Sequence, residues 1–492
     1  MPHLFVILVL VSLSLAGGSG LEGTASHTGS WADGLMPGSI GAGWRLSLVL
    51  SVFIAIGTAG WVGVRVCVRS LDRRGRARAV SWAWRIISLT RVAALLWHFA
   101  SVFVLGLLGV VRDAVGDPVL LDELIASVPA FAVLLWTYRL AHPIERRLRD
   151  ALMIRALDEG RPVYAFPGPW RFVLASARNS LAIMFVPLVF ILGWSEAIDR
   201  VLPLLGPFAD AAEQGGTLAT AGAPAIRLAG SVAIFALIPP VMTRVWDTVP
   251  IPPGELREEL ESLARAHRVR LRRFLVWRTH GSMLNGAVIG ITPWLRYIVL
   301  TDALLESLTE AEVEAVAAHE VAHVRKRHML WLALSVIGAA LLFGEGSALV
   351  LDAAGAHESV ALWGGAGISL VAVLLILGAV SRRFEWQADA FAARHLSGGA
   401  AGAVTDAGAG AMSSALGRVA RLNGIPESRF TWRHGSIATR RRRLRALVGT
   451  RADRLPIDRA VRRVMLMTLL GFGAGAWLAL AGFLELWPYG TG

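Results

Sequence analysis

Residues 309–351 have the sequence TEAEVEAVAAHEVAHVRKRHMLWLALSVIGAALLFGEGSALVL. Thr309 followed three residues later by Glu312 is the pattern of a helix capping box. Acidic residues occupy the first turns of the segment and basic residues its last turn, which complements the dipole of a helix. We therefore expect a helix over 310–328. The apolar run at 329–351 is long enough to cross a bilayer, which takes about 20 residues.

The expected helix carries the motif HEVAH at residues 319–323. Residues four apart lie on one face of a helix, so the imidazoles of His319 and His323 can bind one Zn2+. Glu320 stands beside them and is suited to act as the general base on a water molecule. A catalytic zinc needs a third protein ligand and an open fourth position.

The third ligand is expected in SRRFEWQAD, residues 381–389, which follows a second apolar run. Glu385 and Asp389 are four residues apart and face one way if this stretch is helical. Glu385 can ligate the metal, and Asp389 can accept the outer N–H of a ligand histidine and fix its tautomer. The residues therefore predict a single zinc ion bound by His319, His323 and Glu385.

The composition of the 492 residues indicates a polytopic membrane protein. Hydrophobic residues make up 55% and charged residues only 17%, against about 25% charged in soluble domains. The single cysteine, Cys67, excludes an intrachain disulfide and a cysteine-based zinc cluster. Eight apolar runs approach the length of a span, at about 46–68, 92–112, 124–141, 176–196, 226–245, 329–351, 360–380 and 463–486.

Two of the apolar segments have special features. Pro239 and Pro240 predict a kink or early end in the fifth span. The run from Phe5 to Ala16 is too short to span, and it resembles either the core of a cleaved signal or a short anchoring helix. The sequence does not decide between these two.

The charge distribution predicts the orientation. The net charge is +13, and Lys326 is the only lysine. Arginines gather in the segments 69–91 and 142–175, which the positive-inside rule assigns to the cytoplasm. Counting spans onward puts 246–328 and 381–462 on the same side. We expect a bacterial inner membrane, because arginine replaces lysine and alanine and glycine abound. No basic segment is interleaved with stacking aromatics, which argues against nucleic-acid binding.

These segments give an expected domain organisation. It comprises a signal-like or anchor segment and extracytoplasmic stretch (1–45), a five-span region (46–245), a protease segment with HExxH (246–328), a two-span hairpin (329–380), a second protease segment (381–462) and a C-terminal span (463–492). Within the soluble parts, the patterns predict an amphipathic helix at 254–275, strands at 286–291 and 296–301, and a Gly/Ala-rich loop at 397–410.

The ordered motifs, over about residues 250–445, resemble the integral-membrane zinc metalloproteases of the CAAX prenyl protease and HtpX family. The resemblance implies a mostly α fold: a polytopic membrane bundle of about eight spans with a small cytoplasmic α+β, zincin-like metalloprotease domain. Five spans precede HExxH and two separate it from Glu385, a layout similar to the CAAX branch.

The resemblance also implies roles for residues outside the zinc site. The family carries NAxxxG on a strand that pairs with substrate backbone, and this chain has NGAVIG beginning at Asn285, with Gly286 where alanine is usual. The family then carries a histidine, usually followed by proline, and an arginine six residues later. Here these are His434, Gly435 and Arg440. The resemblance implies that His434 and Arg440 stabilise the oxyanion.

The expected function is a membrane-embedded zinc endopeptidase that acts on membrane proteins or peptides reaching a cytoplasm-facing site. Its expected partners are that substrate and the lipid bilayer, without nucleic acid, and the oligomeric state stays open. Two alternatives remain: a polytopic transporter or scaffold with an incidental metal site, and a signalling protease that cleaves a repressor. The natural substrate cannot be derived from these residues.

Overall fold

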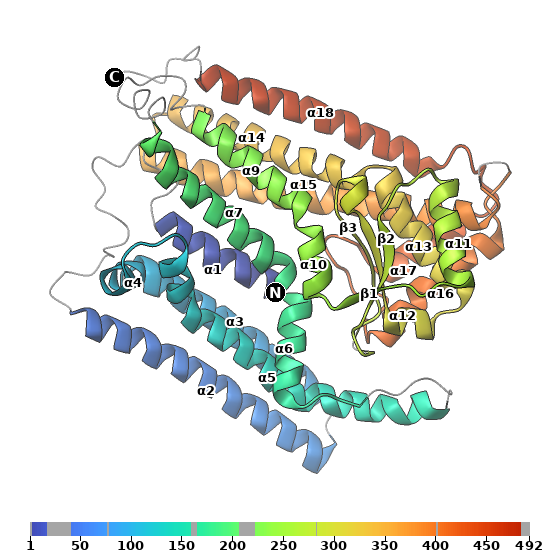
Figure 1. Cartoon of the computed structure of the whole chain (residues 1–492), viewed down its shortest axis with the longest axis horizontal. Coiled ribbons are helices and arrows are strands. Elements are labelled where there is room, and N and C mark those ends of the chain that lie inside the picture. Colours follow the sequence, from blue (N-terminus) through green and yellow to red (C-terminus); the bar gives the residue numbers. More distant parts are fainter. Residues whose placement is uncertain are drawn as a thin grey trace. The chain divides into compact units, whose positions relative to one another are not determined.

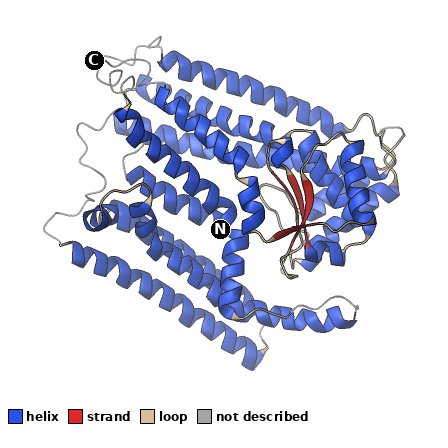
Figure 2. Cartoon of the chain, viewed as in Figure 1, coloured by secondary structure: helices blue, strands red, loops and turns tan. Residues whose placement is uncertain are grey.

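The computed structural model of the chain describes residues 2–16, 41–75, 78–158, 165–205, 222–281, 283–399 and 402–483. These residues are mostly helical, with one small sheet (Figure 2). The chain divides into two compact units, Met1–Asp247 and Thr248–Gly492. Figure 1 labels the elements of both units.

The described residues of the first unit form helices and loops without strands. Long helices α2 (Ala42–Arg74), α3 (Arg78–Phe103) and α5 (Leu121–Asp158) pack against one another. The other helices are α1 (Pro2–Ala16), α4 (Leu107–Val115), α6 (Pro169–Ser180), α7 (Ala182–Val201), the short η2 (Leu202–Leu204), α9 (Ala223–Leu237) and α10 (Pro239–Val245).

Helix α1 is part of the core of the first unit. It packs against α3, α5 and α7. Phe5, Val9 and Leu13 repeat every fourth residue, so they share one face, and all three are buried. The rest of the segment expected at 1–45 lies largely outside the described residues, and the choice between a signal and an anchor stays a prediction.

Seven described helices are long and apolar enough to cross a membrane, or eight if one bent pair counts as a single span. The bent pair is α9 and α10, which meet at an angle of 48°. The break falls at Pro239, as the two consecutive prolines predict. The seven are Ala42–Arg74, Arg78–Phe103, Leu121–Asp150, Ala182–Val201, His328–Ala353, Gly364–Leu396 and Pro456–Ala481.

Two segments expected as loops between spans are partly helical. The expected loop 69–91 is largely helical, since α2 continues to Arg74 and α3 begins at Arg78; only the turn at Gly75, with φ +60°, separates what is described of the two. Helix α5 likewise continues to Asp158, inside the expected loop 142–175. Arginine is a good helix former, and its long side chain lets its charge lie away from its backbone, so arginines need not end a helix.

The second unit contains a four-stranded sheet in the order β1-β2-β4-β3. Its strands are β1 (Thr248–Pro250), β2 (Arg273–Trp277), β3 (Gly286–Ile289) and β4 (Tyr297–Thr301). β2 and β4 are parallel, while β1 and β3 pair antiparallel to their neighbours. The two strands expected from the sequence are β3 and β4. In the strand order of the sheet, β3 lies at an edge.

The expected helix at 254–275 is too long. Helix α11 covers Glu255–Ala266 and ends where Arg268 adopts a left-handed φ of +54°. Residues 273–277 then form β2, in parallel register with β4. A five-residue apolar strand cannot be told from a helix end by periodicity alone, because pairing with a distant strand decides its conformation.

Helices cover the sheet and extend from it (Figure 1). They are α11, α12 (Asp302–Ser307), α13 (Glu310–Arg325), α14 (His328–Ala353), α15 (Glu358–Leu396), α16 (Asp406–Leu422), α17 (Ile437–Leu447) and α18 (Pro456–Phe483), together with the short η4 (Pro293–Leu295). Helix α13 packs against β3, α15 and α16. Buried alanines such as Ala318, Ala322, Ala388 and Ala392 line these helices, and small side chains let α13 and α15 approach closely.

Four expected boundaries in this unit do not coincide with the ends of helices, and the two that concern a helix and a loop, at 328 and within 397–410, are wrong. The helix expected over 310–328 ends at Arg325, and Arg327 turns the chain with a φ of +54° before α14 begins at His328. Helix α15 runs unbroken through the expected hairpin end at 380. Helix α16 starts at Asp406, inside the expected loop at 397–410, because Thr405 caps it. Helix α18 starts at Pro456 rather than at 463.

Candidate functional site

The capping box fixes the start of the HExxH helix. Thr309 Oγ1 accepts a hydrogen bond from the backbone N–H of Glu312, and a Glu312 carboxylate oxygen accepts one from the N–H of Thr309 at 3.0 Å. Two backbone donors that an open helix end leaves unsatisfied are thus paired. The box sets the register in which His319 and His323 face one side.

Two imidazoles converge on one point. The Nε2 atoms of His319 and His323 lie 3.2 Å apart. His319 is buried and His323 is half-buried. Burial, reinforced by the neighbouring His319, holds the pKa of His323 well below its ordinary value. His323 is therefore neutral, which is the form that binds a metal.

Glu385 completes the group from helix α15. Its Oε2 atom lies 3.7 Å from His319 Nε2, and its Oε1 atom lies 3.8 Å from His323 Nε2. The three ligand atoms all lie within 4.8 Å of one another. Ligands at about 2.0–2.1 Å from a tetrahedral zinc stand about 3.3 Å apart. The distance between the two Nε2 atoms matches this value, and the distances to the Glu385 oxygens are about half an ångström longer, so the group has the right size for one ion.

Asp389 lies one turn beyond Glu385 and reaches the other side of His319. Its Oδ1 atom is 3.0 Å from His319 Nδ1. Burial lowers the pKa of His319, but the nearby carboxylates of Asp389 and then Glu385 outweigh it, so the pKa of His319 is raised. A carboxylate at Nδ1 keeps the proton there and leaves Nε2 free to face the ion.

Arg440 is buried between the two carboxylates. Its Nε and Nη2 atoms donate to Asp389 at 2.7 and 2.6 Å, and its Nη1 atom lies 3.2 Å from Glu385 Oε2. Burial disfavours its charge, but Asp389 and then Glu385 outweigh that, so the pKa of Arg440 lies above its ordinary value. Arg440 thus neutralises two buried carboxylates through three contacts.

Glu320 is half-buried beside strand β3. Burial raises the pKa of its carboxyl group. A Cβ atom added at Gly286 would lie 3.0 Å from Val316 Cγ1 and 3.5 Å from Glu320 Cγ. Glycine in place of the usual alanine therefore lets β3 and α13 lie close together at this carboxyl group.

His434 approaches from the loop before α17. It is exposed, and its Nδ1 atom lies 3.1 Å from Glu385 Oε1. The following residue, Gly435, has a φ of +75°. Proline, which is usual here in the family, is fixed near −65° and cannot adopt this conformation. The turn that presents His434 therefore depends on glycine in this chain.

Asn285 lies just before β3, next to Gly286. Its backbone pairs with Thr301, donating to Thr301 Oγ1 and accepting from the Thr301 N–H, both at 3.0 Å. Its side chain is exposed and forms no hydrogen bond in the part of the chain that is described. The amide is therefore available to a ligand.

Sequence reasoning missed a chain of polar residues behind His323. His328 Nδ1 lies 3.0 Å from His323 Nδ1, and His328 Nε2 lies 2.8 Å from Gln387 Oε1. Gln387 in turn donates to Asp458. The ring of His328 stacks on Phe384 with centroids 4.4 Å apart. Only the bend at Arg327, which no sequence pattern marks, aims His328 at the ligand.

The site residues lie in the part of the chain that is similar to known proteins. Residues 250–447 match Peptidase family M48. We refer to these residues as the M48 domain, after the family to which they are similar. The resemblance inferred from the ordered motifs is confirmed, and the domain contains all the site residues expected from the sequence.

Two curated relatives are similar to this domain. The chain is 32% identical over 164 residues to a CAAX prenyl protease 1 homolog of Arabidopsis thaliana, covering 30% of this chain and 38% of that protein. It is 30% identical over 181 residues to the homolog of Oryza sativa subsp. japonica, covering 33% and 42%. The aligned part thus spans about two fifths of the length of these relatives.

A solved structure, the crystal structure of S. mikatae Ste24p, aligns with 81% of this chain and 98% of its own. The TM-score is 0.37 and the identity is 16%.

Proposed function

We propose that the M48 domain is a zinc-dependent endopeptidase. One observation carries the proposal: His319 Nε2, His323 Nε2 and a Glu385 carboxylate oxygen lie within 4.8 Å of one another. Two imidazoles and a carboxylate are a donor set typical of a catalytic zinc, with one position left for water or substrate. The residues present fit one Zn2+.

The other charged groups suit such a site. Asp389 orients His319, and Arg440 offsets the charge of both carboxylates. When bound, zinc polarises the peptide carbonyl group and makes a water molecule a stronger acid. Arg440 positions Asp389 and Glu385 in this proposal, and its remaining N–H donors can assist in stabilising the oxyanion.

Glu320 serves as the general base. Its carboxylate takes a proton from the attacking water and passes it to the leaving amide nitrogen. Burial raises the pKa of this group, which favours its role because a base is most effective when its pKa lies near the working pH. His434, exposed beside Glu385, is the proposed donor to the oxyanion.

Strand β3 and Asn285 provide the substrate site. β3 is an edge strand paired only with β4 within the sheet. An extended peptide adds to such an edge through backbone hydrogen bonds. The unpaired amide of Asn285 then holds the substrate backbone in register beside Glu320.

The proposed substrates are membrane-associated proteins or peptides. The relatives named above are prenyl proteases in plants, whereas the arginine-rich composition of this chain favours a bacterial inner membrane. The arginines near the ends of α2 and α5 favour a cytoplasmic domain. A reporter fused after Arg327 tests this orientation, and an external signal contradicts it.

The zinc-peptidase proposal is tested on the full-length protein in detergent. Zinc is quantified and cleavage of an unstructured reporter peptide is followed. Glu320→Gln should retain zinc and lose at least about 100-fold in cleavage. His319→Ala and Glu385→Ala should lose the zinc. The matched control is Glu314→Gln on the same helix; if Glu320→Gln cleaves as fast as that control, the general-base role is wrong.

A further inference from the structure

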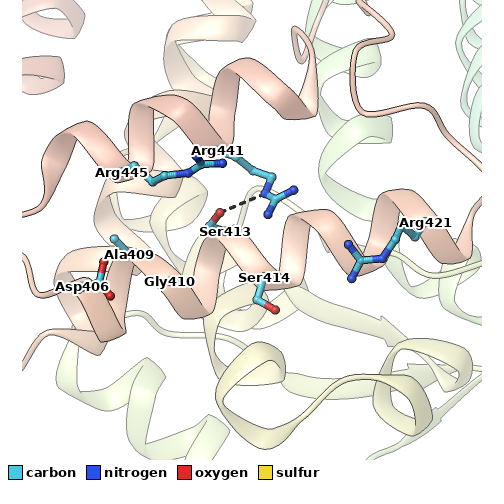
Figure 3. Close-up of a pocket in the computed structure, with 8 residues that line it drawn as sticks. All are labelled: Asp406, Ala409, Gly410, Ser413, Ser414, Arg421, Arg441 and Arg445. Atoms are coloured by element: carbon cyan, nitrogen blue, oxygen red, sulfur yellow. Dashed lines mark hydrogen bonds between the residues drawn. The ribbon is translucent and has the colours of Figure 1, made fainter.

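A second polar cavity lies between helices α16 and α17 (Figure 3). Its volume is about 300 Å³. None of the residues proposed above for catalysis, zinc or substrate lines it. The lining residues are Asp406, Ala409, Gly410, Ser413, Ser414, Arg421, Arg441 and Arg445.

Positive charge predominates around this cavity. Three of its lining residues are arginines, and one, Asp406, is a carboxylate. Arg441 Nη1 lies 2.8 and 2.6 Å from the carboxylate oxygens of Glu427, and Arg421 Nη1 lies 3.9 Å from one of them. Two guanidinium groups thus share one carboxylate.

Arg445 adds a further positive charge. It follows Arg441 by one helical turn, and like charges at this spacing repel each other. Its side chain pairs with no carboxylate within the described ranges. The cavity therefore holds an excess of guanidinium groups, and an anion binding there would relieve the repulsion.

The walls offer further donors and open space. Arg441 Nε donates to Ser413 Oγ at 3.1 Å, as the dashed line in Figure 3 shows. This leaves the Ser413 O–H free to donate in turn. A Cβ atom added at Gly410 would meet no heavy atom within 4 Å. Guanidinium forks and a hydroxyl donor around open space suit the oxygens of a phosphate group.

We propose that this cavity binds a phosphate group, carried either by inorganic phosphate or by a phosphate-monoester lipid headgroup. The group bridges Arg441 and Arg445 on α17 to Ser413 and Arg421 on α16. It stabilises the pairing of these two helices. The proposal does not depend on peptidase activity.

The pairing of α16 and α17 bears on the M48 site through two contacts. Ser414 Oγ donates to Glu312 Oε1 at 2.6 Å, and Glu312 belongs to the capping box of α13. Helix α17 also carries Arg440, which holds Asp389. A phosphate in the cavity therefore supports both the HExxH helix and the arginine behind its ligands.

Thermal unfolding of the zinc-loaded full-length protein in detergent tests the proposal. Inorganic phosphate is titrated at constant ionic strength set with chloride. The unfolding midpoint of the unmodified protein should rise with phosphate. Arg445→Gln, which breaks no ion pair, should respond with about tenfold weaker apparent affinity, since a charge-assisted hydrogen bond is lost. Gly410→Glu places a carboxylate in the cavity and should abolish the response.

Arg442→Gln is the matched control, because Arg442 is exposed on the same helix and does not line the cavity. It should respond to phosphate like the unmodified protein. A second arm replaces inorganic phosphate with short-chain phosphatidic acid, with phosphatidylcholine as its control. A response to phosphatidic acid alone identifies the lipid headgroup as the source. Equal responses of Arg445→Gln and Arg442→Gln, or no response in either arm, overturn the proposal.

Discussion

Two neighbouring arginines of α17 face regions with opposite charge balance. Arg440 is 6% exposed and meets two carboxylates, so its charge is matched within the M48 site. Arg441 lines the cavity toward α16 and shares Glu427 with Arg421, while Arg445 has no carboxylate partner among the residues described. A buried arginine that is paired with carboxylates stabilises a site. A group of arginines with fewer carboxylates than positive charges favours the binding of an anion.

Of the variants proposed, Arg440→Gln should have the largest effect on stability and on bound zinc. It leaves buried Asp389 without its bidentate partner, and removing one member of a buried ion pair costs about 3–5 kcal/mol. We expect a much lower unfolding midpoint and loss of bound zinc, measured by thermal unfolding and metal analysis. Arg442→Gln is the control. If both variants are equally stable, the charge match at Arg440 does not hold the site.

His328→Phe sharpens the description of the matched region. Phenylalanine keeps the stacking on Phe384 and removes the nitrogen that faces His323. Loss of an outer partner of a ligand histidine weakens metal affinity by about 10–100-fold. Zinc competition with a chelator measures this. The exposed His280 provides the control His280→Gln, and an unchanged affinity in His328→Phe would remove His328 from the site.

Gly435→Pro tests the loop that enters α17. Proline cannot adopt the φ of +75° found there, so the variant should displace His434. A misplaced catalytic group can cost about 100-fold in rate. Zinc content should stay unchanged, because none of its three ligands lies in this loop. Gly435→Ala, which is strained but not barred at this φ, should lose less activity. Cleavage at the original rate by Gly435→Pro would contradict the assignment of His434.

The smallest expected effect is the change in stability caused by protonation of His267 in acid. The neighbours of this histidine are basic. His267 Nε2 lies 3.0 Å from His395 Nδ1. Burial, then His395, Arg394 and Arg325, lower the pKa of His267 to about 4. An unfolded chain protonates this group near pH 6.5, so it takes up a proton before the folded protein does. Stability should therefore be complete above about pH 6.5 and decline as the pH falls toward 4.

The histidine contribution is isolated by comparing His267→Gln with the unmodified, zinc-loaded protein. The difference in unfolding midpoint between the two should change across that pH range and level off on either side. A constant difference from pH 7 to pH 4 would show that His267 is not held neutral by its surroundings.

The local pattern of the sequence was sufficient for much of the domain. The capping box at Thr309 and Glu312, the HExxH spacing, strands β3 and β4, and the break at Pro239 all follow from neighbours within a few residues. The M48 resemblance followed from the order of such motifs. The boundaries at Arg74, Arg268 and Arg327 could not be predicted from local pattern. At these polar residues, the contacts with the rest of the fold decide whether the helix continues or the chain turns.

By itself, the sequence determined which residues have the chemistry of a metal site, since spacing on a helix places His319 and His323 together. The sequence also predicted that Glu385, 62 positions beyond His323 in the chain, joins them. Only the tertiary structure decided that Arg440 pairs with Asp389 and that Arg445 is left without a carboxylate partner among the described residues. Contacts between residues so far apart in the chain depend on how the alanine-lined helices pack against each other. This packing depends on the whole fold and cannot be derived from local sequence pattern.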